Sequence, residues 1–499
     1  MLPILIATSV ILGAVLAYLL WVRDWDHWAK KGVPSPKPSF PYGNVKPIFD
    51  GKKTFGDFFD DIIKEWPEEP VIGFYSFFKP MLLLNDPDII NSVVVTNFPK
   101  FVDGAFELSS ADSLFLNTSF WLKGHKAWKE AKSRFTPSFT SSKQKSMVPT
   151  MIDSVQRHFN YALSQKGTDP AEVFQAIKLM LNDSILRIAF SIEVDLIKEA
   201  KDADSQYKQL LDGDLFVDRQ DIHLLFCTSH LASWYFKIRK LRLMSEERHN
   251  FYVEFINSCV EARKKSLEQR NDILQSIIAV EKEAVSEGKR AFTREEWASN
   301  MLTVMVDSTE TAALVLKFIL FAVAQNTKEQ EKLRSELLKA GSSITDFDYD
   351  KIATIRRLDM VINESLRLYS PVLALGKICV ETTKIGDVVV EKGTKVFIPI
   401  SSLHMNPKYH EDPTKFNPER FEDMKSIRSC TFMPFGEGPR ACLGQRYALL
   451  VLKVLLVQIL LTYEVSLEDG YEGPLEFNKM SPFIAALKEE PKWKFTMLK

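Results

Sequence analysis

The chain has 499 residues, of which 45% are hydrophobic and 26% charged, and its formal net charge is -1. Without a basic excess it lacks the charge that nucleic-acid-binding proteins use to hold phosphates, so we expect no nucleic-acid partner. Its five cysteines are scattered and include no Cys-x-x-Cys pair, which argues against a disulfide framework or a zinc ribbon and predicts a reducing compartment for the folded part.

The N-terminal stretch from Met1 to Val22 carries no charged side chain. As a helix it would be about 33 Å long, enough to cross a bilayer core of roughly 30 Å. Trp21, Trp25 and Trp28 suit the membrane interface, and the basic residues close behind them favour the cytoplasmic side. A cleaved signal peptide is the alternative, but a basic start and a clear small-residue cleavage site are missing. We therefore expect residues 1–22 to be a retained single-pass anchor with the body in the cytoplasm.

Residues 23–45 predict a hinge. Between Pro34 and Pro41, four prolines fall within eight positions, which makes a stiff, extended spacer that cannot be helical. A plain disordered linker is the alternative. A hinge of this kind would hold the body, residues 46–499, at a set orientation to the membrane.

The body predicts one large domain that is mostly α with small, segregated β-sheets (α+β). Long stretches have helical spacing, and Asp86-Pro87 marks a helix start. Short apolar runs that predict strands lie early and late in the chain: Val71–Tyr75, Met81–Leu84, Val388–Val390, Val396–Ile400 and Phe483–Ala486.

One predicted helix is unusually long. A capping box at Thr293–Glu296 opens it, and nothing need end it before about Gln325, which gives a length of roughly 48 Å. Its middle contains Asp307, Glu310 and Lys317. Because each charge at the centre of a membrane helix costs about 2.5–3.5 kcal/mol, we expect a buried helix of the body and not a second membrane span.

The segment Phe435-Gly-Glu-Gly-Pro-Arg-Ala-Cys-Leu-Gly444 carries the strongest chemical signal. Cys442 precedes an apolar helical run, so its sulfur lies near unpaired N–H groups that favour the thiolate, a strong metal ligand. The glycines let a flat group approach the backbone, and Arg440 offers donors suited to a carboxylate. A planar metal complex that bears carboxylates and needs an axial thiolate is haem. A buried structural cysteine is the alternative interpretation.

This segment resembles the haem-binding loop of the cytochrome P450 family. It matches the pattern Phe-x-x-Gly-x-Arg-x-Cys-x-Gly at every fixed position, and the similarity covers nearly the whole chain. It is most similar to the animal microsomal group, which includes drug- and steroid-metabolising members. The resemblance implies a P450-like fold, with Cys442 as axial ligand of the iron in haem b (iron protoporphyrin IX) and with Phe435 and Arg440 also binding the cofactor.

Two further motifs acquire roles from the resemblance. Glu364 and Arg367 are spaced to pair on one helix face, and with Arg420 they resemble the charge network that locks the loop before the cysteine, which is a structural role. On the long helix, Glu310 and Thr311 resemble the catalytic acid–alcohol pair that relays protons to dioxygen. Asp307 and Ser308 depart from the family's small residues, which puts the geometry of the oxygen pocket in doubt; alternatively, they face away from haem or bond to water.

Trp128 and Lys132, one helical turn apart, resemble a tryptophan and an arginine that contact a haem propionate. Lysine keeps the charge but loses the bidentate geometry, and a solvated surface lysine is the alternative. Lys377 is a looser candidate for a second propionate contact. Basic residues near the implied haem edge are candidate docking points for a redox partner: Lys123, Lys126 and Lys129.

Substrate contacts are implied only by the family's segments. The residues that fall in them are Phe106, Phe115, Met305, Val372, Leu373 and Phe483, and ordinary core packing is the alternative. The apolar stretch from Phe216 to Leu243 ends in basic residues, which is typical of a segment that dips into the membrane surface, although a core helix would fit equally well. His404 and His410 are expected at the surface.

The resulting hypothesis is a haem–thiolate monooxygenase of the endoplasmic reticulum membrane. It would insert one oxygen atom from O2 into a small hydrophobic substrate, such as a xenobiotic, a steroid or a fatty-acid-like molecule. No glycine-rich nucleotide loop is present, so electrons from NADPH would arrive through a cytochrome reductase flavoprotein in the same membrane. The alternatives are a haem–thiolate isomerase or dehydratase that acts on a peroxide without a reductase, and a haem-binding sensor without turnover.

Overall fold

The structure is a computed structural model that describes residues 2–211, 223–224, 227–228, 235, 238–468, 471 and 473–498. Helices make up most of this part of the chain. They are α1 (Leu2–Val22), α2 (His27–Lys30), α3 (Lys46–Phe49), α4 (Phe55–Glu65), α5 (Pro87–Asn91), α6 (Ser113–Leu116), α7 (His125–Phe135), α8 (Ser141–Ser164), α9 (Pro170–Phe190), α10 (Leu196–Glu199), α11 (Lys208–Leu211), α13 (Glu246–Lys265), α14 (Ile273–Ser286), α15 (Arg294–Gln325), α16 (Thr327–Ala340), α17 (Tyr349–Thr354), α18 (Arg356–Leu368), α19 (Ile400–His404) and α20 (Gln445–Thr462).

The strands form small sheets apart from the main helical layers, as expected. One sheet has the order β1-β2-β6-β3, in which β2 and β6 are parallel and the other pairs are antiparallel. Two separate antiparallel pairs, β4-β5 and β7-β8, complete the strands of the described residues. Their bounds are β1 (Val71–Ser76), β2 (Lys79–Leu84), β3 (Leu375–Ile378), β4 (Thr383–Ile385), β5 (Val388–Val390), β6 (Lys395–Ile398), β7 (Tyr463–Leu467) and β8 (Trp493–Met497).

Two strand predictions need correction. The run Val396–Ile400 continues only to Ile398, because Pro399 has no N–H for the ladder and stands at the N-cap of α19. The run Phe483–Ala486 is not a strand; its Ile484 makes an isolated bridge to Val372. The stretch Phe216–Leu243 falls largely outside the described residues.

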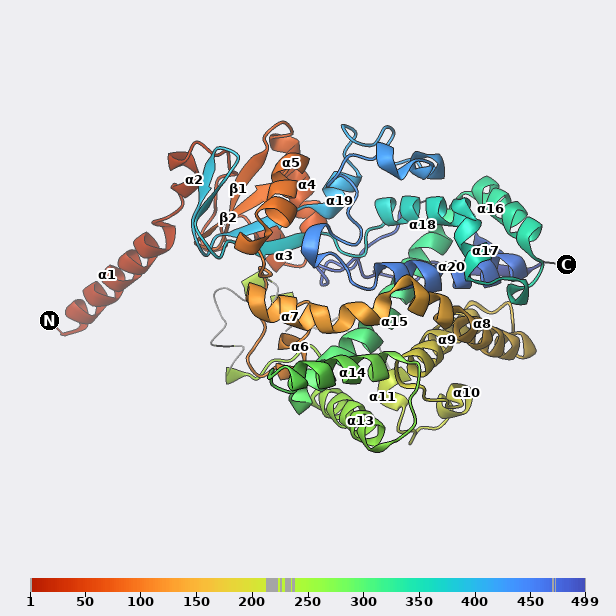
Figure 1. Ribbon diagram of the computed structural model, residues 1–499. Helices are drawn as coiled ribbons and strands as arrows, with labels where there is room; N and C mark the ends of the chain where they lie inside the picture. The colour runs from red at the N-terminus through yellow and green to blue at the C-terminus, as the bar shows by residue number, and fades with distance from the viewer. Residues whose placement is uncertain are drawn as a thin grey trace.

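The long helix α15 runs through the middle of the body, with α18 and α20 on one side and α9, α13 and α14 on the other (Figure 1). Thr293 begins it as expected: its side chain accepts from the Glu296 N–H, and the Glu296 carboxylate accepts from the Thr293 N–H. The helix is buried on both sides of its centre, but Asp307 and Thr311 keep exposed side chains. The centre of α15 is therefore more exposed than the helix on either side of it.

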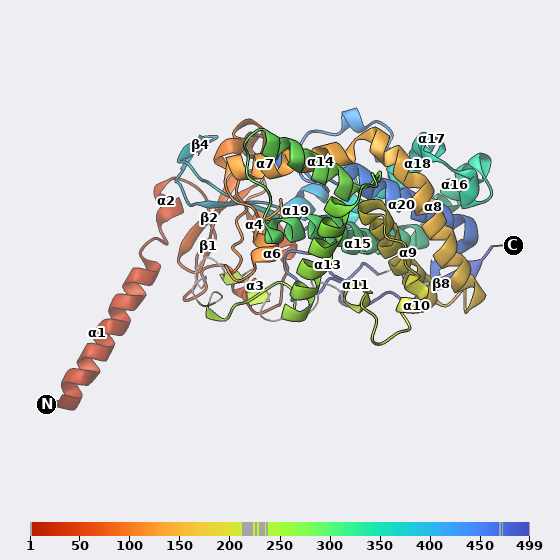
Figure 2. The ribbon, with the colours of Figure 1, turned by 60° about the horizontal axis from the view of Figure 1, so that its bottom comes forward.

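The N-terminal helix α1 projects away from the body (Figure 2), and its side chains from Ile6 to Leu20 are exposed. Length and composition alone would also let α20 cross a membrane, but most of its side chains are buried, as in the core helix of a globular protein. The described apolar part of α1, Ile6–Val22, is shorter.

The segment after α1 is fastened to the first sheet. The Trp21 indole N–H donates to the Pro41 carbonyl at 2.8 Å, and the Gly73 N–H donates to the Pro34 carbonyl at 2.8 Å. Trp28 is 0% exposed, and a Cβ on Gly73 would meet its ring at 2.3 Å. The expectation that Trp28 faces the membrane interface is therefore wrong, because its ring is used to pack the hinge onto β1.

Candidate functional site

The Cys442 loop lies directly before α20 and is closed by a hydrogen bond from the Cys442 N–H to the Phe435 carbonyl at 2.8 Å. Gly438 has a φ of 76°, in the left-handed region. A Cβ there would approach the Val94 carbonyl oxygen at 2.0 Å, so the backbone packing requires glycine. The loop is thus held in one shape by its own bonds and by the chain beneath it.

Burial raises the pKa of the Cys442 thiol to about 11, while the Gly444 and Gln445 N–H groups pull it down. As expected, the N–H groups at the helix start lower the pKa and so favour the thiolate, but burial has the larger effect. The side chain nevertheless keeps accessible surface. A side chain that is deep in the protein and still has accessible surface faces an interior space and not the outer surface of the molecule.

The centre of α15 lies opposite this thiol. Asp307 has the same two properties, exposed surface and a pKa raised to about 7 by burial, and its charge in turn helps to raise the pKa of Cys442. The Thr311 hydroxyl donates to the Asp307 carbonyl. The Ser308 hydroxyl donates to the Met305 carbonyl at 3.0 Å, so it is satisfied within its own helix. Asp307 therefore lines the same interior face as Cys442, whereas the Ser308 hydroxyl is turned to its own backbone.

Glu310 lies on the side of α15 that meets α13. Burial raises the pKa of Tyr252 on α13, and the charge of Glu310 adds to that rise. Glu310 and Thr311 are thus adjacent in sequence, but their side chains have different neighbours.

Arg440 and Lys132 come together at Trp128, and Lys377 lies close enough to Arg440 for their charges to interact. The Arg440 guanidinium donates to the backbone carbonyls of Val102, Ser119, Phe120 and Leu122. Its central carbon lies 5.6 Å from the centroid of the Trp128 ring, and the Lys132 ammonium lies 5.4 Å from it. The Lys132 ammonium also donates to the Pro439 carbonyl. The Trp128 ring thus contacts Arg440, which belongs to the Cys442 loop, and Lys132, which donates to that loop.

These three cations are short of negative charge. Burial lowers the pKa of Arg440 to about 10, and burial together with Arg440 lowers the pKa of Lys377 to about 7; Asp103 opposes both shifts. Burial also lowers the pKa of Lys132. Within the described residues none of the three forms an ion pair with a carboxylate. An anionic group placed among them would relieve this cost.

The residues present therefore fit haem. Cys442 offers a sulfur ligand, the left-handed glycines keep the loop close to the chain, and three underpaired cations offer sites for the two propionates. The described residues contain no cluster of three or more His, Cys, Asp or Glu side chains that could hold a bare metal ion.

Comparison with known proteins agrees with this geometry. The sequence model of the family described as Cytochrome P450 matches residues 33–496. The chain belongs to the cytochrome P450 family. It is 29% identical to Cytochrome P450 6j1 of Blattella germanica, with 91% of this chain and 90% of the relative covered. It is 28% identical to Cytochrome P450 6a2 of Drosophila melanogaster (96% and 96% covered) and 27% identical to Cytochrome P450 3A18 of Rattus norvegicus (96% and 95% covered). Members of this family are monooxygenases that bind haem.

In this cytochrome P450, Glu364 and Arg367 form a buried ion pair behind the loop. Both side chains are 0% exposed, and two donor–acceptor contacts of 2.7 and 2.8 Å join them. Arg367 also donates to the carbonyls of His404 and Pro413 at 2.9 and 2.7 Å. Arg420 reaches Glu364 at 3.4 Å. The network ties α18 to the chain that leads to the cysteine.

His404 corrects the sequence-based expectation of a surface histidine. It is 0% exposed, and its Nε2 accepts the Met433 N–H at 2.8 Å. Burial lowers the pKa of His404 to about 3, with His410 and Arg367 adding to the effect, so the ring is neutral and can accept. His410 is also buried. The only sequence signal was the apolar company of Ile400 and Leu403, which is weak.

The six residues assigned to substrate contact lie in or near the core of this P450. Phe106, Phe115, Met305, Leu373 and Phe483 are buried and Val372 is partly buried. Phe106 and Phe483 are joined edge to face, with ring centroids 5.0 Å apart. The candidate docking lysines Lys123, Lys126 and Lys129 are all exposed at or near the start of α7.

Proposed function

We propose that the protein is a membrane-anchored P450 monooxygenase that inserts one atom of O2 into a small hydrophobic substrate with electrons from NADPH. The observation that carries the proposal is the placement of Cys442 opposite the centre of α15, with the cations around Trp128 beside them. Bound haem b would supply oxygen activation and insertion. Cys442 would bind its iron, and Arg440, Lys132 and Lys377 would hold its propionates.

The remaining residues of the site would position groups and move protons. Thr311, whose hydroxyl proton is donated to the Asp307 carbonyl, would accept a hydrogen bond at the oxygen-binding face and would pass its own proton on only after leaving that carbonyl, and Glu310 would exchange protons from the α13 side. The pair Glu364–Arg367, with Arg420, would keep the loop in shape. Phe106 and Phe483 would form part of an apolar wall that excludes water from the substrate.

The domain organisation supports a role at the membrane. Residues 1–22 would anchor the protein in the endoplasmic reticulum, residues 23–45 would form the hinge, and residues 46–499 would be the cytoplasmic haem domain. The exposed apolar surface of α1 supports this arrangement. Lys123, Lys126 and Lys129 would attract the acidic face of a flavoprotein reductase, because exposed charge of one sign steers a partner of the other.

The test is the carbon monoxide difference spectrum of the reduced protein. Wild type is expected to show the thiolate-type Soret band and Cys442→Ser to lose it. The matched control is Cys259→Ser, a partly buried cysteine on α13, which should keep the band. A thiolate-type band in Cys442→Ser would overturn the proposal.

Activity measurements separate the alternative functions. Oxygen consumption that depends on NADPH, reductase and an apolar substrate supports the monooxygenase. Rearrangement of a peroxide without reductase would support an isomerase instead, and a stable ferrous–dioxygen complex without product would support a sensor.

A further inference from the structure

The centre of α15 faces the interior of the protein at two positions. Between Met301 and Leu320, only Asp307 and Thr311 have exposed side chains, and they lie one helical turn apart on the same face of the helix. Asp307 is also close enough to Cys442 for its charge to raise the pKa of that thiol. The Asp307 carboxyl and the Cys442 sulfur therefore face the same interior space from two different elements.

The hydroxyl groups of this turn already donate their protons within the helix. Ser308 and Thr309 both donate to the Met305 carbonyl, at 3.0 and 3.1 Å, and Thr311 donates to the Asp307 carbonyl. A hydroxyl bonded in this way can still accept a hydrogen bond, but it can donate to a new partner only after the first bond breaks. None of these three alcohols is therefore ready to give a proton to a molecule in the interior space.

The Asp307 carboxyl differs from these alcohols. Burial raises its pKa to about 7, and within the described part of the chain no charged group contributes to the shift. The titratable groups around it are Cys442 on the facing loop and, on the α13 side, Glu310 with Tyr252. A carboxyl with an ordinary pKa near 4 would be ionised at neutral pH, whereas this carboxyl can both hold and release a proton there.

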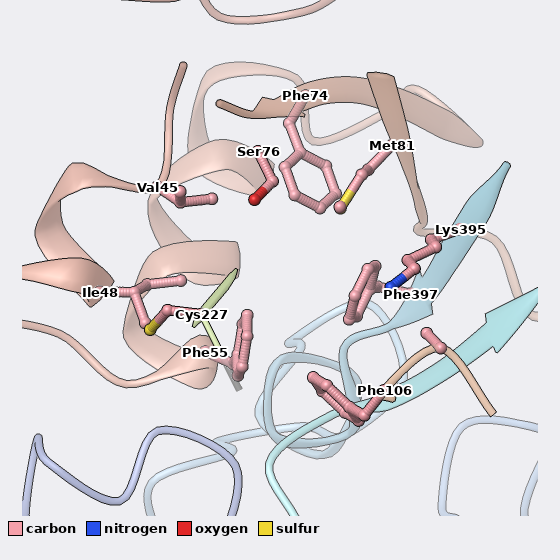
Figure 3. Close-up of a pocket in the computed structure, with 11 residues that line it drawn as sticks. Val45, Ile48, Phe55, Phe74, Ser76, Met81, Phe106, Cys227, Lys395 and Phe397 are labelled. Carbon is pink, nitrogen blue, oxygen red and sulfur yellow. The ribbon is translucent and has the colours of Figure 1, made fainter. Parts of the chain in front are cut away.

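The candidate substrate wall is apolar. Figure 3 shows Phe106 beside Phe55 and Phe397 in a mainly aromatic pocket under the first sheet. The Phe106 ring also meets Phe483, with ring centroids 5.0 Å apart. An apolar wall keeps water away from the reacting groups, and water is the usual alternative source of protons. This wall therefore favours a side chain of α15 as the proton source.

Glu310 is placed to supply Asp307 with new protons. It lies three residues later on α15, so the two carboxyls are neighbours on the helix surface. Its charge acts on Tyr252 of α13, which places it on the flank of α15 away from Cys442. A proton can thus reach Asp307 from one side of the helix and leave it on the other.

We propose that Asp307 is a catalytic residue whose carboxyl delivers protons to oxygen at the haem site and is reloaded from the side of Glu310. The proposal rests on the proposed monooxygenase function and adds a residue to it. In that reaction RH, O2, NADPH and H+ give ROH, H2O and NADP+, so two electrons and two protons convert one oxygen atom into water. For each proton, the Asp307 O–H bond breaks, an O–H bond forms on the oxygen, and the carboxylate takes up a new proton.

The first measurement is the infrared absorption of the oxidised full-length haem protein, titrated from about pH 5 to about pH 9. Wild type is expected to show a protonated carboxyl band that disappears around pH 7, since the pKa of Asp307 is about 7. Asp307→Asn should lose this band. Asp387→Asn is the matched control, because Asp387 is fully exposed in the turn between β4 and β5, and it should keep the band.

The second measurement follows the fate of oxygen with NADPH and a flavoprotein reductase, without added substrate. One NADPH reduces O2 to hydrogen peroxide, whereas two NADPH reduce it to two molecules of water. Because proton delivery favours water, the ratio of peroxide to NADPH should lie below one in wild type. This ratio should rise as the pH increases through about 7, where Asp307 loses its proton.

The variants separate a proton donor from a merely structural residue. In Asp307→Asn the ratio should approach one at every pH. Asp307→Glu keeps a carboxyl and should regain part of the wild-type pH profile, and Asp387→Asn should behave as wild type. The proposal is overturned if wild type lacks the titrating carboxyl band, if its ratio is one at every pH, or if Asp307→Asn keeps the wild-type ratios.

The same samples separate this proposal from the proposed function. The carbon monoxide difference spectrum of each variant reports the thiolate site. A normal thiolate band together with wild-type ratios in Asp307→Asn would reject the role of Asp307 alone. Absence of the band in wild type would instead reject the monooxygenase.

Discussion

The two sides of the proposed haem site differ in how they are held. Behind the Cys442 loop, Glu364 and Arg367 are fully buried and bonded to several backbone carbonyls, and His404 accepts the Met433 N–H. Across from it, the centre of α15 carries Asp307, whose carboxyl has no partner among the described residues. The loop side is held by several polar contacts, whereas the helix side keeps a carboxyl group that faces the interior without a partner among the described residues.

The difference teaches that the two sides do different work. If Cys442 binds iron as proposed, its sulfur has to stay at a fixed place, and a loop braced from several directions would meet that need. A surface that binds dioxygen and substrate needs polar groups that are not already bonded within the protein. Only such groups can form hydrogen bonds to the incoming molecules. The predictions below disturb each side in turn.

Breaking the brace should have the largest effect. Arg367→Ala leaves the Glu364 carboxylate buried without its main partner, so we expect a loss of about 3–5 kcal/mol in the free energy of unfolding. Denaturant unfolding and haem content measure it. The control is Arg428→Ala, whose exposed pair with Asp88 should contribute about 1 kcal/mol or less. Equal losses for both arginines would contradict the contrast between the two sides.

His404 tests the same side with a smaller change. His404→Leu leaves the Met433 N–H without an acceptor, which should cost about 1–3 kcal/mol in unfolding free energy. His404→Gln offers an oxygen to that N–H and should lose less.

The pH dependence of stability adds a second readout for His404. Since the folded pKa of about 3 lies below the ordinary 6.5, the unfolded chain binds more protons between these values. Stability should therefore fall as the pH drops through that range, and His404→Gln, measured by unfolding at several pH values, should flatten the fall. An unchanged slope would show that other groups set it.

Asp307 probes the less constrained side. Asp307→Asn removes a negative charge that opposes the Cys442 thiolate, so the reduction potential of the bound haem should rise by an amount on the order of tens of millivolts. Spectroelectrochemistry above pH 7, where burial still allows Asp307 to ionise, measures the rise. Thermal unfolding should stay close to wild type, in contrast to Arg367→Ala. A fall in the potential would contradict the placement of Asp307 opposite Cys442.

Lys132 should show the smallest effect. Lys132→Arg restores a fork of donors beside Trp128, and haem should leave the protein a few-fold more slowly, on the order of 0.5–1 kcal/mol. Transfer of haem to an acceptor protein gives the rate. Lys129→Arg, exposed on the same helix, is the control and should leave the rate unchanged.

Local patterns were sufficient for much of the fold. The capping box at Thr293 predicted the start of α15, and Asp86 caps α5 as its sequence indicates, because both signals act within one helical turn. The run Phe483–Ala486 was misread, since strand formation depends on a partner strand that no local pattern reveals. Pro399 ended β6 earlier than the apolar run suggested.

The site was predictable where a short motif carries it and not where distant segments meet. The residues from Phe435 to Cys442 specify their loop, and Glu364 and Arg367 lie one helical turn apart. The burial of His404 arises from packing against chain segments far away in sequence, so its apolar neighbours in sequence were only a weak signal. The burial that raises the pKa of Cys442 was missed for the same reason, because burial depends on the whole fold.

The fastening of Trp28 against Gly73, with Trp21 bonded to Pro41, has a mechanical consequence. These contacts join the segment after α1 directly to the first sheet of the folded body. If α1 lies in a bilayer as proposed, a tilt imposed on this helix would be transmitted through these contacts to the folded body.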